Sequence, residues 1–270
     1  MKNVKLVAVD MDGTLLFPDK AMPDWAIPLV KRLIDQDIMF AVSSGRLYHN
    51  LMKLFEEVVH DIVLIAENGA LVMDKGEIVY SSVITREDAR LLLEEVRKLP
   101  GTKTTICGLD AGYLFASEIE DLADALSSGY FANPVVIDTI DDIPEGEQIL
   151  KFAIFDEAGD AVTTIRDGLA HVDHKFQVAV SGAEWADIMN VGVNKGVAMK
   201  ALQAKYGITY EETMAFGDQL NDMEMMSEAY YSYAMANGIP ELKAVSNFEA
   251  PSNEESGVLK VVEELLAGRV

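Results

Sequence analysis

The stretch VKLVAVDMDGTLL (residues 4–16) decides the fold, because an apolar run leads directly into two carboxylates. A Val/Leu/Ala run without polar alternation is typical of a parallel strand that is covered on both faces. Functional groups in such sheets lie just beyond the carboxyl ends of the strands, where Asp10 and Asp12 stand. Two buried acids so close together are costly unless a cation or a proton neutralises them. This arrangement suits a hard, oxygen-preferring metal ion and attack on phosphate.

The length and composition of the chain limit the classes of protein to which it can belong. At 270 residues with 50% hydrophobic content, the chain can form one α/β domain and a smaller companion. Its single cysteine, Cys107, excludes an intramolecular disulfide and a cysteine-based zinc cluster, so we expect a small buried hydrophobe there. We find no leader-like segment at the N-terminus and no apolar run near the ~20 residues of a membrane span. We therefore expect a soluble, cytoplasmic protein.

The charge balance is strongly acidic, with 22 Lys and Arg against 45 Asp and Glu and a formal net charge of -23. Such a field repels nucleic acid and anionic membranes, so neither is an expected partner. It would also repel a phosphorylated substrate. A phosphate site in this chain therefore needs a locally positive pocket, which a divalent ion and one or two cationic side chains could supply. We expect a monomer or a weak homodimer.

Apolar runs alternate with amphipathic helical patterns in both terminal parts of the chain, which is typical of a βαβ sheet. After the first strand, the patterns predict helices and strands at 23–36, 38–42, 47–59, 62–66, 195–206, 213–216, 220 onward, 231–234 and 257–267. These segments predict one doubly wound parallel sheet domain made from residues 1–82 and 189–270.

The middle of the chain, residues 83–188, has a different pattern. It predicts paired strands with helices between them, at 86–99, 104–107, 113–116, 118–128, 134–137, 150–155, 159–169, 175–180 and 185–190. We therefore predict an α+β domain inserted into the first domain.

Four motifs stand at predicted strand ends or at a helix start. They are DMDGTLL (10–16), Ser43-Ser44-Gly45-Arg46, Gly192-Val193-Asn194-Lys195-Gly196 and Gly217-Asp218-Gln219-Leu220-Asn221-Asp222. In this order they resemble the haloacid dehalogenase superfamily of phosphatases, and segment 83–188 resembles the large α/β cap (type IIB) of its Cof-like branch. The resemblance spans essentially the whole chain. It implies a Rossmann-like core, Mg²⁺ as cofactor, and small phosphorylated metabolites, such as sugar phosphates, as substrates.

The two acids of the first motif have distinct predicted roles. Asp10 is the predicted nucleophile, since a carboxylate can attack phosphorus once a magnesium ion neutralises the meeting anions. Asp12 can protonate the leaving oxygen and then deprotonate the water that hydrolyses the aspartyl-phosphate. The resemblance implies that the backbone carbonyl of Asp12 also binds the metal. The alternative for this motif alone is a simple turn, since Asp-x-Asp-Gly often marks one.

The phosphate itself is expected to contact the loops after the first two strands. Met11 is placed among the phosphate-binding residues, Gly13 permits a tight backbone, and Thr14 can hold the loop by a hydrogen bond. Ser44 offers a hydroxyl and a backbone amide to a phosphoryl oxygen, and Gly45 lets the next helix start close by. Ser43 is a weaker candidate, and the alternative for both serines is N-capping of helix 47–59.

Lys195 and the last motif complete the predicted site. A cation at a helix start opposes the helix dipole, so Lys195 is better explained by neutralising Asp10 and the transferred phosphoryl group. Asn194 could bind phosphate or cap this helix. Asp218 would complete the magnesium shell with Asp10 and the Asp12 carbonyl. Asp222 is expected to orient either the metal shell or Lys195. Asn221 is a candidate phosphate ligand.

The remaining polar residues give weaker signals. The four histidines lack ligand spacing, and Arg46 could contact substrate or form a helix-surface ion pair. Asn237 is expected to shape the rim of the site. Nothing in the sequence selects among the candidates of the inserted domain, which are Asp110, Tyr113 and Glu184.

The sequence thus predicts a magnesium-dependent phosphatase acting through an aspartyl-phosphate. The alternatives are a phosphotransferase or mutase on the same core, and a phosphate-ligand sensor without turnover. The intact set of Asp10, Asp12, Lys195 and Asp218 opposes the sensor, because a binding site does not need an acid two residues after a nucleophile.

Overall fold

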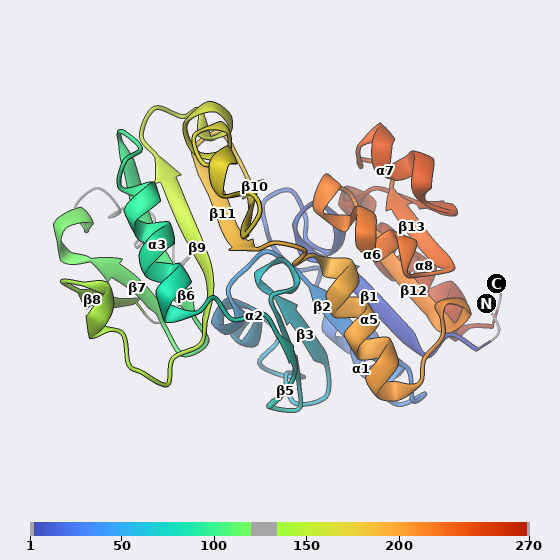
Figure 1. The fold of residues 1–270 in the computed structure, drawn as a ribbon. Coiled ribbons are helices and arrows are strands. Elements are labelled where there is room, and N and C mark those ends of the chain that lie inside the picture. The colour runs from blue at the N-terminus through green and yellow to red at the C-terminus, as the bar shows by residue number, and fades with distance from the viewer. Residues whose placement is uncertain (1–2, 120–133, 269–270) are drawn as a thin grey trace. The chain divides into compact units, whose positions relative to one another are not determined.

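A computed structural model describes residues 3–119 and 134–268 of the chain. The chain divides into two compact units, Met1–Tyr80 with Asn194–Val270 (unit 1) and Ser81–Val193 (unit 2) (Figure 1). The predicted domain boundaries, 82/83 and 188/189, lie within a few residues of this division. That unit 2 serves as a cap stays a prediction.

Unit 1 contains an eight-stranded sheet in the order β14-β13-β12-β1-β2-β3-β4-β5. Its strands are β1 (Leu6–Asp10), β2 (Met39–Ser43), β3 (Val63–Ala66), β4 (Leu71–Asp74), β5 (Glu77–Ser81), β12 (Thr213–Gly217), β13 (Tyr231–Met235) and β14 (Phe248–Ala250). The central strand β1 pairs in parallel with β2 on one side and with β12 on the other. The two separated pieces of chain therefore meet at the middle of one sheet.

Helices cover the sheet of unit 1. They are α1 (Ala26–Ile34), α2 (Tyr48–Leu54), α5 (Lys195–Tyr206), α6 (Met223–Ser227), α7 (Pro240–Val245) and α8 (Gly257–Leu266). Leu6 and Ala8 belong to the same apolar cluster as Met199 of α5, so Val7 and Val9 point to the opposite face by strand alternation. All five residues of β1 are buried, as the apolar run predicts. The α/β fold with a doubly wound core is thus confirmed.

The sheet is not wholly parallel, in contrast to the prediction. Strand β4 runs antiparallel to β3, and β4 and β5 flank a turn at Lys75 and Gly76, both with positive φ. Neither strand was predicted, nor were β14 and α7. Lys-Gly is not among the favoured hairpin pairs, so the turn carried little signal. Helix α2 also ends at Leu54, earlier than the predicted 59.

Unit 2 is an α+β structure with a six-stranded sheet in the order β10-β11-β9-β6-β7-β8. Its elements are α3 (Arg86–Val96), β6 (Thr102–Gly108), β7 (Gly112–Phe115), β8 (Pro134–Ile137), β9 (Ile149–Asp156), β10 (Phe176–Val180) and β11 (Trp185–Asn190). The pairs are antiparallel except β7 with β8. Most of the predicted element at 118–128 lies outside the described residues. The predicted helix 159–169 is observed as a six-residue π-helix, Val162–Asp167, which is followed by a short 3₁₀ helix, Ala170–Val172.

The two faces of the unit 2 sheet differ in chemistry. Phe152 and Ile154 of β9 join Leu92 of α3 in an apolar core. Lys151 alternates with Phe152 and so points to the other face, where its Nζ lies 3.3 Å from a carboxylate oxygen of Asp187. Both side chains are buried. Unit 2 therefore contains a buried ion pair in its sheet.

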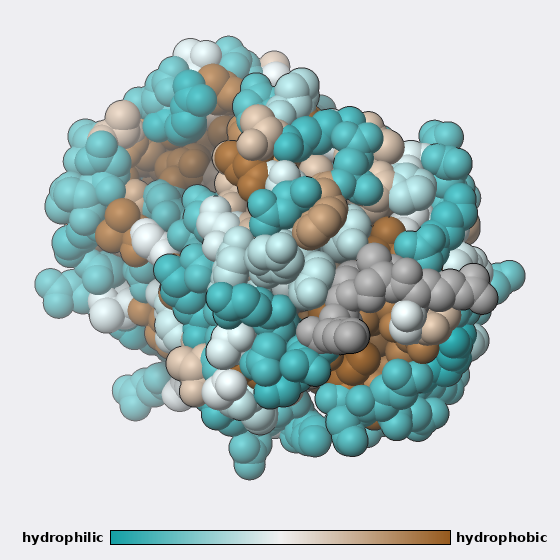
Figure 2. Space-filling model, turned by 90° about the vertical axis from the view of Figure 1, so that its right-hand side faces the viewer, coloured by the Kyte–Doolittle hydropathy of each residue, from teal (hydrophilic) through white to brown (hydrophobic). Residues whose placement is uncertain are grey.

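The surface reflects the acidic composition of the chain. Figure 2 shows one face of the molecule on which hydrophilic residues predominate, interrupted by smaller apolar areas. Cys107 is buried, as predicted. Among the helices of the described residues, none has the length and apolar character needed to cross a membrane.

Candidate active site

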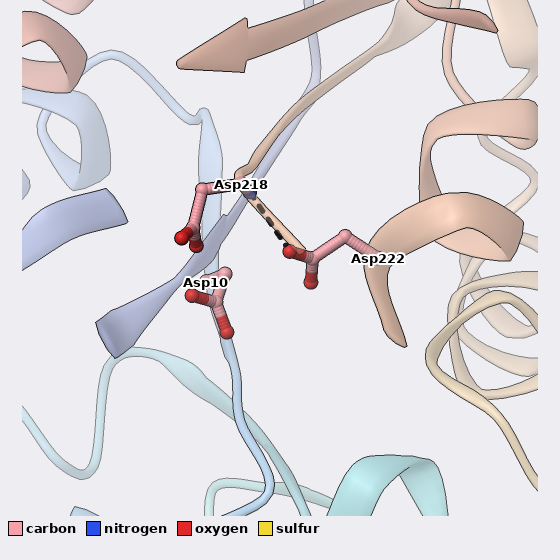
Figure 3. A group of neighbouring side chains, drawn as sticks. All are labelled: Asp10, Asp218 and Asp222. Atoms are coloured by element: carbon pink, nitrogen blue, oxygen red, sulfur yellow. Dashed lines mark hydrogen bonds between the residues drawn. The ribbon is translucent and has the colours of Figure 1, made fainter. Parts of the chain in front are cut away.

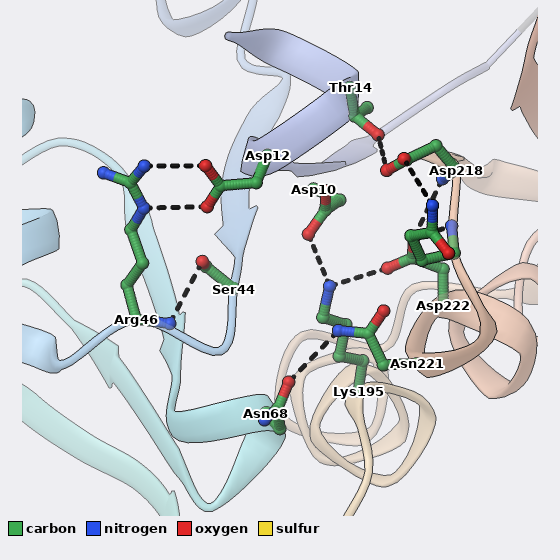
Figure 4. Close-up of polar contacts among 11 residues, drawn as sticks. Asp10, Asp12, Thr14, Ser44, Arg46, Asn68, Lys195, Asp218, Asn221 and Asp222 are labelled. Carbon is green, nitrogen blue, oxygen red and sulfur yellow. Dashed lines mark hydrogen bonds and ion pairs between the residues drawn. The ribbon is translucent and has the colours of Figure 1, made fainter. Parts of the chain in front are cut away.

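The predicted site residues come together at one edge of the unit 1 sheet (Figure 4). Asp10 is the last residue of β1 and pairs in register with Ser43, the last residue of β2. Asp218 directly follows β12, and Lys195 is the first residue of α5. The arrangement arises because the carboxyl ends of parallel strands meet at the same edge of a sheet.

Lys195 lies at the centre of this group. Its Nζ is 2.5 Å from Asp10 Oδ1 and 2.6 Å from Asp222 Oδ1, and all three side chains are buried. Burial acts to lower the pKa of Lys195, but the two carboxylates raise it overall, so the ammonium group stays charged. Burial raises the pKa of Asp10 well above its usual range, and Lys195 offsets part of this. The cation at the helix start therefore neutralises the predicted nucleophile.

Asp222 connects Lys195 to the loop that carries Asp218. While Oδ1 of Asp222 binds Lys195, its Oδ2 accepts hydrogen bonds from the backbone amides of Asp218 (2.9 Å) and Gln219 (3.1 Å). Thr14 donates a hydrogen bond to Asp218 Oδ1 at 2.9 Å. Both predicted supporting residues thus lie where they can orient the acids of the site.

The acids fit a magnesium ion. Asp10, Asp218 and Asp222 each offer a carboxylate oxygen, and these oxygens all lie within 4.8 Å of one another (Figure 3). Burial and the neighbouring charge of Asp222 raise the pKa of Asp218 to about 6, so a cation bound beside this carboxylate would favour its charged form. The two oxygens of Asp222 contact Lys195 Nζ and two backbone amides. Asp10 and Asp218 stay the predicted direct ligands.

Gly13 lets the first motif approach Asp218 closely. It has φ +84, and a Cβ atom there would lie 2.2 Å from Asp218 Oδ2. Its carbonyl oxygen accepts a hydrogen bond from Asn237 Nδ2 at 2.8 Å, which ties the loop after β13 to the site. The glycine is therefore needed for the packing of the Asp218 carboxylate as well as for a tight turn.

Arg46 contacts Asp12 through two hydrogen bonds, Nε to Oδ2 at 2.8 Å and Nη2 to Oδ1 at 2.7 Å. Lys20 Nζ is 3.0 Å from the same carboxylate. Partial burial acts to raise the pKa of Asp12, but the hydrogen bonds and charges of Arg46 and Lys20 lower it overall. Arg46 therefore forms an ion pair with a predicted site residue, which neither alternative for it named, and its contact with substrate stays a prediction.

Two polar groups turn out to be occupied within the fold. The Ser44 amide donates to the Ile65 carbonyl at 2.9 Å, so it is not available to phosphate and only the hydroxyl remains a candidate. Ser44 Oγ accepts from the Arg46 amide at 3.2 Å and does not cap α2, which begins after Leu47 without a side-chain cap. Asn194 Oδ1 accepts from the Val197 amide at 2.8 Å, which is the capping alternative.

Two candidate site residues of unit 2, Asp110 and Tyr113, contact another residue of the same unit. Tyr113 donates a hydrogen bond to Glu147 at 2.5 Å, and the Asp110 amide donates to the same carboxylate at 3.1 Å. Burial, followed by the Glu147 contact, raises the pKa of Tyr113. These contacts hold a loop of unit 2 together.

Asn68 is a site residue that the sequence did not identify. Its side-chain oxygen accepts a hydrogen bond from Asn221 Nδ2 at 3.2 Å (Figure 4). The segment Glu67-Asn68-Gly69 follows β3 at the same sheet edge, and this position was the available signal. The role of Asn221 as a phosphate ligand stays a prediction.

Residues 7–262 match a sequence model of haloacid dehalogenase-like hydrolases. The chain is 28% identical over 266 residues to 5-amino-6-(5-phospho-D-ribitylamino)uracil phosphatase YbjI of Escherichia coli K12, covering 98% of this chain and 97% of the relative. It is 30% identical to an HMP-PP phosphatase of Enterobacter sp. strain 638, covering 89% and 87%.

Solved structures show the same fold. SMU.1108c from Streptococcus mutans UA159 superposes with a TM-score of 0.85 at 31% identity, covering 98% of this chain and 99% of that one. A haloacid dehalogenase-like hydrolase from Bacteroides thetaiotaomicron, at 22% identity, has a TM-score of 0.84 with 97% and 99% coverage. The predicted family is confirmed: the chain belongs to the haloacid dehalogenase-like hydrolases.

Proposed function

We propose that the protein is a magnesium-dependent phosphatase that hydrolyses phosphate monoesters of small metabolites through an aspartyl-phosphate on Asp10. The observation that carries this proposal is the buried contact of Lys195 with Asp10 and Asp222, beside Asp218, at the carboxyl edge of one sheet. An ion pair with only a structural role needs one acid and one base, whereas one lysine and three acids gather here. The names of the phosphatases similar to this chain give independent support.

In the first step, a carboxylate oxygen of Asp10 attacks phosphorus and the bond to the ester oxygen breaks. Asp12 gives its proton to that oxygen, which leaves as an alcohol. A dianionic phosphate placed beside Asp12 favours the protonated acid, because like charge raises the pKa of a carboxyl group. Lys195 holds the nucleophile and balances the negative charge that accumulates around it.

In the second step, Asp12 takes a proton from water, and the resulting hydroxide attacks phosphorus and releases inorganic phosphate and the Asp10 carboxylate. The contacts of Arg46 and Lys20 keep the pKa of Asp12 low, which favours the anionic form that this step requires. When bound by Asp10, Asp218 and the Asp12 carbonyl, Mg²⁺ would neutralise charge between the nucleophile and the phosphoryl oxygens.

The nucleophile assignment is tested by Asp10→Asn, measured as magnesium-dependent phosphate release from p-nitrophenyl phosphate. We expect wild-type turnover that needs Mg²⁺ and loss of turnover in the variant, with unchanged thermal unfolding as the control for folding. Wild-type rates in Asp10→Asn would remove Asp10 as nucleophile. Transfer to a second alcohol, in place of phosphate release, would favour a phosphotransferase or mutase.

The substrate class follows from the relatives and not from a residue of this chain. YbjI is named for a compound with a phosphorylated ribityl group, which is a small phosphorylated metabolite. We propose that the substrates of this chain are small organic phosphates such as sugar phosphates. A panel of sugar phosphates together with 5-amino-6-(5-phospho-D-ribitylamino)uracil, assayed with and without Mg²⁺, tests this.

A further inference from the structure

The turn after β3 has an uncommon backbone. Glu67, Asn68 and Gly69 have φ values of +52, +54 and +97 in succession. Residues other than glycine seldom adopt this region, although asparagine does so more readily than most. Both Glu67 and Asn68 are also buried. Two buried residues in succession in this region store backbone strain, and such strain clusters at functional sites.

Contacts attach this turn to the loop after β2. The Asn68 amide donates to the Ser44 carbonyl at 3.0 Å, and the Glu67 amide donates to the Arg46 carbonyl at 3.2 Å. The Asn68 side chain lies against Gly45, where a Cβ atom would be 2.9 Å from Asn68 Oδ1. The turn is therefore held against the segment that carries the predicted site residues Ser44 and Gly45.

The same turn contacts the start of α5 and the loop after β12. A Cβ atom at Gly69 would lie 2.3 Å from the carbonyl oxygen of Asn194, the residue before Lys195. Asn68 Oδ1 accepts the hydrogen bond from Asn221 Nδ2 at 3.2 Å. The side chain of Asn68 therefore connects the turn to Asn221, a predicted phosphate ligand.

We propose that Asn68 is a positioning residue, whose side-chain oxygen fixes the amide of Asn221 in the orientation that binds the phosphoryl group. This inference rests on the proposed phosphatase function and adds to it a residue that acts through another. In Figure 4, Asn68 and Asn221 come from separate segments and meet beside Lys195, next to Asp10. The hydrogen bond restricts the Asn221 side chain before phosphate arrives, which reduces the entropy cost of binding.

A purely structural role for Asn68 makes a different prediction. A turn former needs only a left-handed backbone, which glycine adopts without strain. Asn68→Gly therefore keeps the backbone and removes the side chain. Lys75→Gly is the matched control, because Lys75 also has positive φ (+51) and is exposed in the turn between β4 and β5.

The test is a double-mutant cycle of Asn68→Gly and Asn221→Ala, measured as kcat and KM for p-nitrophenyl phosphate and as the inhibition constant of inorganic phosphate. We expect each single variant to raise KM and the inhibition constant by about 3–10-fold, the effect of one hydrogen bond. The double variant should resemble the singles, since the two residues act as one unit. Lys75→Gly should match the wild type.

Two results would overturn the inference: wild-type constants in Asn68→Gly, or a double variant whose loss is the product of the single losses. If Asn68→Gly does not fold, Asn68→Asp replaces it, because Asp keeps an acceptor oxygen and tolerates the backbone. Asn221→Ala should then weaken phosphate binding in the Asn68→Asp background as it does in the wild type. A wild type without magnesium-dependent hydrolysis would remove the proposed function, whereas an active wild type with additive variants removes only the role of Asn68.

Discussion

The two hydrogen bonds from Arg46 to Asp12 place a guanidinium group beside the predicted acid and base. A planar guanidinium fixes a carboxylate in two directions, whereas a lysine ammonium acts as a single point charge. Arg46 therefore determines where the Asp12 carboxylate points, in addition to its effect on the pKa. The direction matters because proton transfer requires the acid within hydrogen-bond reach of the reacting oxygen.

We expect Arg46→Gln to lower kcat by about 10–100-fold, part of the usual contribution of a general acid and base. Arg46→Lys should lie between this variant and the wild type, because it keeps the charge and loses the two-point contact. The measurement is kcat and KM for p-nitrophenyl phosphate. Arg90→Gln is the matched control, since Arg90 pairs with Asp141 at the surface of unit 2. Wild-type kcat in Arg46→Gln would contradict the positioning of Asp12.

Sequence reasoning found single residues where a strand pattern leads into a polar motif, as with Asp10 and Asp218. It could not assign Arg46, because the contact with Asp12 depends on a side-chain conformation across two loops. It also gave the Ser44 amide to phosphate, whereas that amide continues the hydrogen bonding between β2 and β3. How far a strand continues to pair depends on its partner strand, so the local sequence pattern does not predict where the pairing ends.

Among the elements, most strands with apolar runs were predicted, whereas β4, β5 and β14 were missed. Strands β1 and β9 are almost entirely buried, so their sequences carry a clear signal. Strand β5 is half exposed and strand β14 has three residues, so neither offers enough apolar periodicity to be recognised. Helix α5 was predicted with its observed bounds, because Asn194 and Gly207 mark its two ends.

The buried pair of Lys151 on β9 and Asp187 on β11 makes the stability of unit 2 depend on pH. Burial raises the pKa of Asp187, although Lys151 offsets part of the rise. The folded protein therefore keeps the Asp187 proton to a higher pH than the unfolded chain does. This contribution to stability is full below the unfolded pKa and is lost as the pH rises through the folded pKa.

We expect Asp187→Asn to remove this part of the pH dependence, measured as the free energy of unfolding in urea between pH 4 and pH 8. At neutral pH the variant should also lose about 3–5 kcal/mol, because the buried Lys151 ammonium loses a carboxylate. The double variant Lys151→Met/Asp187→Leu is the control and should recover most of the loss. An unchanged pH profile in Asp187→Asn would show that Asp187 does not titrate in this range.

For the whole molecule, the net charge of -23 acts against both compactness and the approach of an anionic substrate. The contacts of Lys195 act only at short range, whereas the overall field extends over a Debye length of about 10 Å at 0.1 M salt. Added salt should therefore raise the activity and the stability of this protein. It would slow an enzyme whose charge attracts its substrate.

We expect kcat/KM for p-nitrophenyl phosphate and the midpoint of thermal unfolding to rise together between 10 and 200 mM NaCl, at fixed Mg²⁺. The physical reason is the screening of repulsion among like charges. A series with KCl at equal ionic strength controls for specific ion effects. A fall in kcat/KM with salt would show instead that a local positive field steers the substrate into the site.

Strand β1 obtains its two neighbours from parts of the chain made at very different times. Its β2 edge is closed by residues 39–43, but its β12 edge waits for residues 213–217. Synthesis on the ribosome adds about 5–20 residues/s, so roughly 200 further residues leave that edge unpaired for about 10–40 s. Nascent chains of this protein should therefore depend on chaperones, and a circular permutant that begins at residue 194 and joins the old termini would shorten the delay.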